Sequence, residues 1–143
     1  MIRRALARWV WRNPDERVER RLKRSFWQRM LMKELARLYN PDSSPEFEGE
    51  IGYELVTSRG TADWTLAIGH GRARVRRGRA PKPGLRVHVR AVDLDRMLIG
   101  QITTREALLG GRMTVHGQYA TAIRIGELFT PGATADIPRD RAA

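Results

Sequence analysis

Hydrophobic and polar residues alternate most regularly in the second half of the chain. Residues 85–91 have apolar side chains at every second position, which predicts a strand with one buried face. Apolar residues then recur at helical spacing over 94–102, directly after Asp93, a residue type that often caps a helix N-terminus. Residues 113–117 alternate again, and residues 120–129 form a last apolar helix. This half therefore predicts the order strand, helix, strand, helix.

Between the last two helices, Thr103 and Glu106 have the spacing of a capping box. They predict a short helical turn that ends at the glycine pair Gly110-Gly111.

The first half predicts a long helix followed by three strands. The segment 13–16 is a typical helix start, with asparagine as the cap and proline at the first helical position. The apolar face that follows continues to about Tyr39. Alternating patterns over 47–57, 63–68 and 72–76, separated by glycine-containing turns, predict three strands.

Strands that follow one another after short turns favour antiparallel pairing. The predicted fold is therefore α+β, with a five-stranded, mostly antiparallel sheet whose first four strands follow in meander order and whose helices cover one face. A chain of 143 residues is long enough for one core. We expect a basic N-terminal extension over residues 1–12, one domain over 13–130 and a flexible tail over 131–143.

Residues 1–12 predict a short amphipathic helix with a basic polar face. Arg4 and Arg8 lie between apolar positions, and Trp9 and Trp11 follow on the same helix. Basic helices with tryptophan are typical of segments that lie at a lipid surface, so these four residues are candidate membrane contacts. The alternative is that the helix packs on the domain or on a second copy of it, because a single short helix binds membranes weakly.

The formal net charge of +11 is unevenly distributed. Residues 1–40 and 72–92 each carry +8, whereas residues 41–71 between them carry −5. This polarity favours an anionic partner or surface, and a basic surface that is merely solvated is the alternative. The chain has no cysteine, no apolar run long enough to span a membrane and no secretory signal pattern. We expect a cytoplasmic protein with peripheral membrane contact.

One basic surface is expected on the sheet itself. Two successive predicted strands place basic side chains on one face if the strands pair, and these residues are Arg72, Arg74, Arg76, Arg86, His88 and Arg90. Like charges opposite each other are unfavourable, so the face is a candidate site for nucleic acid, an anionic headgroup or an acidic protein. It lacks the exposed aromatic residues on which single-stranded nucleic acids stack. A solvated arginine face is the alternative.

The sequence contains no constellation that predicts catalysis or metal binding. His70, His88 and His116 do not have the spacing of metal ligands, and no phosphate-binding, dinucleotide-binding or nucleophile motif occurs. Asp93 and Asp95 lie close together, but their position at a helix start favours capping over a catalytic carboxylate pair. We therefore expect a protein that is not an enzyme and needs no cofactor.

Residues 92–129, VDLDRMLIGQITTREALLGGRMTVHGQYATAIRIGELF, resemble the second half of the sterol carrier proteins, also called nonspecific lipid-transfer proteins. The shared features are an acid-capped helix, a short helix ending in glycine, a strand containing Gly117, and an apolar last helix ending in Leu-Phe. The first half is similar more loosely, through Gly49, Ile51 and the strand with Trp64. The resemblance implies an apolar tunnel between sheet and helices that holds a sterol, fatty acyl or isoprenoid-type ligand without catalysis.

The expected function is thus non-catalytic binding and transfer of a hydrophobic lipid-like ligand, with basic surfaces docking on anionic membrane. Medium-sized apolar residues and adaptable methionines are the candidate ligand contacts, with plain core positions as the alternative: Trp64, Leu66, Met97, Leu98, Ile102, Leu108, Met113, Val115, Ile125, Leu128 and Phe129. The alternative function is a binding module for nucleic acid or an acidic protein that uses Arg72, Arg74, Arg76, Arg86 and Arg90.

Overall fold

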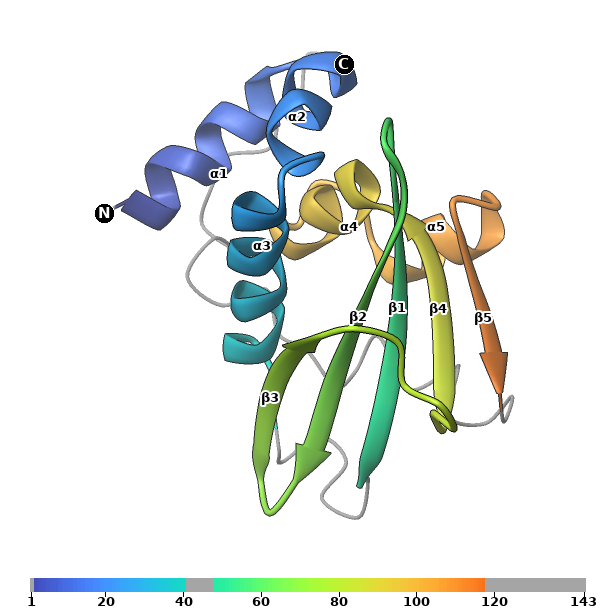
Figure 1. The fold of residues 1–143 in the computed structure, drawn as a ribbon. Coiled ribbons are helices and arrows are strands. Elements are labelled where there is room, and N and C mark those ends of the chain that lie inside the picture. Colours follow the sequence, from blue (N-terminus) through green and yellow to red (C-terminus); the bar gives the residue numbers. More distant parts are fainter. Residues whose placement is uncertain (1, 41–47, 118–143) are drawn as a thin grey trace.

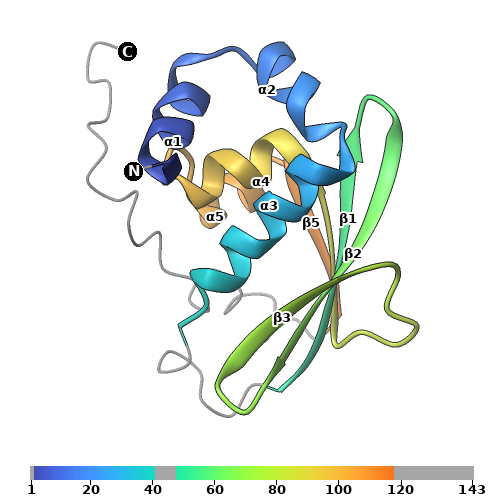
Figure 2. The ribbon, with the colours of Figure 1, turned by 60° about the vertical axis from the view of Figure 1, so that its left-hand side comes forward.

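The structure, a computed structural model, describes residues 2–40 and 48–117, with side chains from residue 4 onward. Within these ranges the strands form one five-stranded sheet, and the helices lie on one of its faces (Figures 1 and 2). The α+β fold with a mostly antiparallel sheet is therefore confirmed. The helix predicted over 120–129 and the tail predicted over 131–143 lie outside the described residues.

The strands have the order β3-β2-β1-β4-β5 in the sheet. Their bounds are β1 (Gly49–Thr57), β2 (Gly60–Gly69), β3 (Arg72–Arg77), β4 (Leu85–Arg90) and β5 (Met113–Gly117). Strand β1 is parallel to β4, and the other neighbouring strands are antiparallel. The expected meander is thus correct for the first three strands only.

The fourth strand lies beside β1 rather than β3, because its connection crosses the sheet. Residues 78–84 pass over the outer face of β2 and β1, the face without helices (Figure 1). The Thr65 hydroxyl donates a 2.8 Å hydrogen bond to the Gly78 carbonyl at the start of this crossing. At its end, the Gly84 N–H donates to the Glu50 carbonyl at 2.9 Å, which places β4 along the free edge of β1.

The bounds of the helices are α1 (Ile2–Arg12), α2 (Asp15–Leu22), α3 (Ser25–Arg37), α4 (Ala91–Leu98) and α5 (Thr104–Leu109). Helix α3 packs on β3 and β2, α4 packs on β4 and β1, α5 packs on the edge strand β5, and α1 and α2 extend the helical layer. Helix α1 packs on α4, and α2 contacts both α3 and α4. Figure 2 shows the helices gathered on one side, with the strands on the other.

The core lies between this helical layer and the inner face of the sheet. Strand β4 shows the pattern most clearly, because Leu85, Val87 and Val89 are fully buried while His88 and Arg90 are exposed. Strands β1 and β2 add further buried residues, namely Ile51, Tyr53, Leu55, Trp64, Leu66 and Ile68. The period-two alternation thus identified the buried face of each of these strands.

The single long helix predicted from residue 13 to about Tyr39 is wrong, because the chain forms α2 and α3 with a break at Lys23 and Arg24. At the break, the side-chain amide of Gln28 donates a 2.9 Å hydrogen bond to the Leu22 carbonyl. The predicted asparagine cap is also wrong. Asn13 instead donates its side-chain amide to the Trp9 carbonyl at 2.6 Å and ends α1.

The two caps predicted in the second half had different outcomes. Helix α4 begins at Ala91, so Asp93 lies in its first turn, where it accepts hydrogen bonds from Arg90 at 2.9 and 3.1 Å. The Asp93 carboxylate therefore pairs with Arg90 and does not cap the helix N-terminus. The capping box of Thr103 and Glu106 is confirmed, with both reciprocal hydrogen bonds formed at the start of α5.

Candidate functional site

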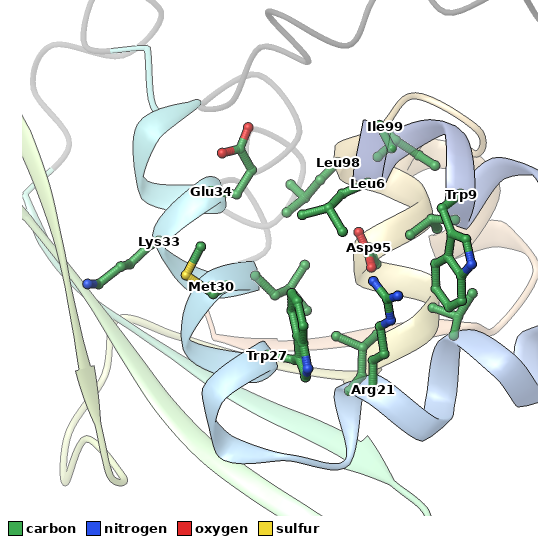
Figure 3. A pocket seen from close by; sticks show the side chains of 15 residues that line it. Leu6, Trp9, Arg21, Trp27, Met30, Lys33, Glu34, Asp95, Leu98 and Ile99 are labelled. Atoms are coloured by element: carbon green, nitrogen blue, oxygen red, sulfur yellow. The ribbon is translucent and has the colours of Figure 1, made fainter. Parts of the chain in front are cut away.

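An apolar cavity of about 260 Å³ lies between α1, α2, α3 and α4 (Figure 3). Most of its lining side chains are apolar, and they are Leu6, Ala7, Trp9, Val10, Val18, Leu22, Trp27, Met30, Leu31, Leu98 and Ile99. Four charged residues also line it, namely Arg21, Lys33, Glu34 and Asp95.

Helix α1 forms one wall of the cavity because its apolar side chains recur at helical spacing. Ala7 and Val10 are buried, and Leu6 and Trp9 are half-buried beside them, while Ala5 and Arg8 on the opposite face are exposed. The amphipathic pattern of residues 1–12 therefore buries its apolar face in this protein's own helical layer.

Arg96 fixes α1 and the following turn to α4. Its guanidinium, which is almost fully buried, donates to the carbonyls of Val10 at 2.9 Å and Asn13 at 2.8 Å. It also pairs with Asp15 at 2.9 Å and donates to the side chain of Gln101 at 2.7 Å. A single buried cation thus binds backbone carbonyls at the end of α1 and the carboxylate of Asp15 at the beginning of α2.

Arg21 lies between two indole rings at the edge of the cavity. Its guanidinium carbon is 4.0 Å from the ring centroid of Trp9 and 5.1 Å from that of Trp27. Cation–π contacts of this kind hold the guanidinium in place without using its N–H groups. In the part of the chain that the structure describes, the Arg21 guanidinium forms no hydrogen bond or ion pair.

Asp95 is the acidic side chain that α4 directs into the cavity. Burial raises the pKa of Asp95 to about 7, with a further rise from the nearby charge of Glu34 and an opposing effect from Arg96. Glu34 itself forms an ion pair with Arg37. The Asp95 carboxylate forms no hydrogen bond or ion pair with any described residue.

Sequence reasoning missed Asp95 because it interpreted the acids at the start of α4 as capping residues. The spacing did contain the signal. Val92, Asp95 and Ile99 recur at intervals of three and four, so they share one face of α4, and Val92 and Ile99 are buried. A carboxylate on an apolar helix face is the feature that marks this site.

Of the predicted ligand residues, Leu98 lines the cavity. Trp64, Leu66 and Met113 are buried in the core between sheet and helices. The remaining described members, Met97, Ile102, Leu108 and Val115, are partly buried against that core. Ile125, Leu128 and Phe129 lie outside the described residues.

Two of the four predicted membrane contacts are exposed to solvent, and the other two are half-buried. Trp9 and Trp11 are half-buried against the domain, whereas Arg4 and Arg8 are exposed on α1. Helix α3 exposes two large apolar side chains to solvent. The exposed fraction is 62% for Phe26 and 43% for Met30.

The predicted arginine face is distributed over two separate strands. Strand β3, with Arg72, Arg74 and Arg76, is an edge strand, and β2 and β1 separate it from β4, with Arg86 and Arg90. The expected stacking of like charges between β3 and β4 is therefore wrong. It assumed that strands adjacent in sequence are adjacent in the sheet.

Acidic residues of β1 and β2 lie between these basic side chains. Glu50 pairs with Arg76, and Glu54 lies 3.1 Å from Arg79 and 3.8 Å from His88. Asp63 lies 3.9 Å from Arg79. The outer face of the sheet thus carries both acidic and basic side chains, many of them paired, and its electrostatic potential is not uniformly positive.

The described residues include no group of three or more metal-ligating side chains. None of the helices in the described ranges has the length and apolar character needed to cross a membrane.

Comparisons with known proteins give similarity in structure only. No family model and no curated protein matches the sequence. Sterol carrier protein 2 like 2 from Aedes aegypti is 19% identical with a TM-score of 0.60, over 71% of this chain and 94% of that one. Sterol carrier protein 2 from Yarrowia lipolytica is 16% identical with a TM-score of 0.55, over 69% and 85% of the two chains.

A sec-alkylsulfatase from Pseudomonas sp. is also similar, at 18% identity and a TM-score of 0.55. The match covers 68% of this chain but 16% of the sulfatase, so the fold recurs there as a small part of a larger protein. At these identities the comparisons establish architecture, and they agree on one: the chain has the fold of the sterol carrier protein 2 domains.

Proposed function

We propose that this protein binds a hydrophobic lipid-like ligand of the sterol, fatty acyl or isoprenoid type and transfers or presents it without catalysis. The observation that carries the proposal is the mostly apolar cavity of about 260 Å³ that four helices line. Small-molecule sites are concave, mostly apolar and usually about 300–1,000 Å³, so this cavity has the composition and nearly the size of such a site.

The similar structures support this ligand class. Several are sterol carrier proteins, and one is the palmitated form of the Aedes aegypti protein, 18% identical over 68% of this chain. Burial of an apolar chain stabilises a complex by about 0.8 kcal/mol per methylene group, so hydrocarbon alone supplies useful affinity. In this proposal the ligand contacts Leu98, Ile99 and the inner face of α1, while Trp64, Leu66 and Met113 form the packed core behind it.

Native mass spectrometry of the purified protein, followed by lipid extraction, tests whether a ligand is retained. Displacement of a fluorescent fatty acid then measures affinity. Ala7→Phe is expected to fill the cavity and weaken binding by about tenfold or more, whereas Ala5→Phe, the same change on the exposed face of α1, leaves it unchanged. A wild-type protein that retains no lipid and binds neither a fluorescent fatty acid nor a long-chain alcohol would overturn the proposal.

We also propose that the protein exchanges its ligand while docked on an anionic membrane. Arg4 and Arg8 are exposed on α1, and α3 exposes Phe26 and Met30 next to the exposed Arg29. Apolar side chains flanked by cations suit a lipid interface, where each basic residue contributes about 1 kcal/mol.

Sedimentation with vesicles tests the docking. Wild-type protein is expected to bind vesicles that contain phosphatidylserine and to ignore neutral ones, with weaker binding after Phe26→Ser or Arg8→Glu. Equal binding to both vesicle types would contradict an electrostatic contribution. The nucleic-acid or acidic-protein function is not proposed, because Arg76, His88 and Arg90 of the predicted arginine face each lie beside an acidic side chain.

A further inference from the structure

Two of the four charged residues that line the cavity carry groups of opposite chemistry. Asp95 enters from α4 and Arg21 from α2, and their ends point toward one another in Figure 3. They form no ion pair with each other, and neither group has a hydrogen-bond partner among the described residues. Asp95 and Arg21 thus offer a hydrogen-bond acceptor and a donor to a ligand that enters this mostly apolar cavity.

We propose that the cavity selects apolar ligands that end in a neutral hydroxyl group over ligands that end in a carboxylate. In this arrangement the ligand hydroxyl donates a hydrogen bond to the Asp95 carboxylate and accepts one from the Arg21 guanidinium. The inference rests on the proposed function, because it names the ligand class that the same cavity takes. Asp95 is then the residue that determines specificity.

The charges around Asp95 favour a neutral head group over either ion. A ligand carboxylate would meet Arg21, but it would also lie against the Asp95 carboxylate and close to the charge of Glu34. A ligand ammonium would meet Asp95, but Arg21 and Lys33 also line the cavity, and the charge of Arg96 acts on Asp95. A hydroxyl pays neither penalty and uses both polar groups.

The charged residues in and beside the cavity belong to three of its four helices. Arg21 belongs to α2, Lys33 and Glu34 to α3, and Asp95 with its neighbour Arg96 to α4. Helix α1 contributes Leu6, Ala7, Trp9 and Val10, which are all apolar. The discrimination therefore depends on the ionisation of Asp95, whose raised pKa places its titration near neutral pH. Exclusion of carboxylates should strengthen as the pH rises through about 7.

Calorimetric titration with dodecan-1-ol and dodecanoate tests the inference, since the two ligands differ only in the head group. The measurements are made at about pH 6 and about pH 8.5, on either side of the pKa of Asp95 at about 7. Wild-type protein is expected to bind the alcohol at least about tenfold more tightly than the carboxylate at the higher pH, because like charges in one site are strongly unfavourable. The ratio should fall at the lower pH.

Asp95→Asn isolates the contribution of the charge. The amide still accepts a hydrogen bond, so alcohol binding should remain within about threefold of wild type, while dodecanoate should bind about tenfold more tightly at the higher pH. Asp63→Asn, the same substitution on the outer face of the sheet, should change neither affinity. Circular dichroism and the retained alcohol affinity show that the variant is folded.

Two results would overturn the inference and leave the proposed function intact. One is equal or tighter binding of dodecanoate to the wild-type protein at the higher pH. The other is an unchanged preference in Asp95→Asn. If neither ligand binds and no lipid is retained, the proposed function fails first, and the selection of a hydroxyl head group fails with it.

Discussion

The indole N–H of Trp64, in the middle of β2, donates a 3.1 Å hydrogen bond to the side-chain carbonyl of Gln28 on α3. Both residues are buried, and the amide nitrogen of the same glutamine donates to the Leu22 carbonyl at 2.9 Å. One side chain thus satisfies the polar atom of the largest buried residue and the end of α2. Gln28 sets both the position of α3 on the sheet and the break between the two helices.

Gln28→Leu should therefore destabilise the protein by about 1–3 kcal/mol, because a buried N–H and a carbonyl lose their partners. Urea unfolding followed by tryptophan fluorescence measures the change. In a double-mutant cycle with Trp64→Phe, the second substitution should cost less in the Gln28→Leu background, since the indole N–H is then already unpaired. Additive effects would show that the hydrogen bond contributes nothing.

Arg96→Met should detach α1 from α4. The substitution removes the donors for the Val10 and Asn13 carbonyls and leaves Asp15 without one of its arginine partners. We expect a loss of about 1–3 kcal/mol, the usual cost of leaving buried carbonyls without a donor, together with faster trypsin cleavage within residues 2–12. Arg8→Met, at an exposed position of α1, serves as the control. Equal protease resistance in both variants would contradict the anchoring role.

Asp95→Asn should stabilise the protein at alkaline pH. The folded-state pKa of Asp95 is raised from 3.8 to about 7, so the folded protein holds a proton that the unfolded chain has released between these values. The penalty is absent below pH 3.8, grows as the pH rises, and is complete above about 7. At about 1.4 kcal/mol per pKa unit, the variant should gain up to about 4 kcal/mol at pH 8.

Thermal unfolding of wild type and Asp95→Asn between pH 4 and pH 8 measures this difference. The two curves should converge toward pH 4. A variant that is less stable than wild type at pH 8 would mean that the ionised carboxylate has a stabilising partner.

Asp15 has the opposite pH dependence. Burial raises its pKa, but hydrogen bonds from Arg96 and Arg90 outweigh that effect and lower the pKa below 3.8. A lowered pKa contributes stability that is present above the unfolded value and is lost as the pH falls toward the folded one. Wild-type protein should thus lose the contribution of the Arg96–Asp15 contact in acid, and hydrogen exchange in α1 should become faster. Arg96→Met should show a smaller acid transition, because Arg90 still pairs with Asp15.

Gly117→Ala should be strongly destabilising, because β5 ends against β4 without room for a side chain. Gly117 has φ of 139°, and a Cβ there would lie 2.5 Å from the Gly84 carbonyl oxygen and 2.8 Å from Leu85 Cδ2. We expect a cost of at least about 1–3 kcal/mol from the backbone conformation alone. Gly69→Ala, where a Cβ meets nothing within 4 Å, is the control and should be nearly neutral. Similar melting temperatures would refute this steric account.

The strands were predictable from the sequence because local alternation determines which face is buried. Leu85, Val87 and Val89 show this directly. The order of the strands was not predictable in the same way, because it depends on the path of residues 78–84 across the outer face. No periodicity encodes that path.

The cavity was predictable in part. The apolar face of α1 and the spacing of Leu98 and Ile99 are visible in the sequence, but their meeting depends on a buried arginine that contacts backbone carbonyls. Such contacts have no sequence pattern, since any residue offers a carbonyl. The sequence shows Asp95 as an acid on an apolar helix face. Its role was missed because acids at the start of a helix usually act as capping residues.

The parallel pairing of β1 with β4 has a consequence for the rate of folding. Strand β2 follows β1 after the turn at Ser58 and Arg59, so that pairing closes a short loop, whereas β4 reaches β1 only after β3 and the crossing segment. Closing the longer loop costs more entropy before any contact repays it. Stopped-flow kinetics should show that Leu66→Ala slows folding while Val87→Ala mainly accelerates unfolding. The β1–β2–β3 unit then acts as the nucleus, and the rest of the sheet assembles on its open edge.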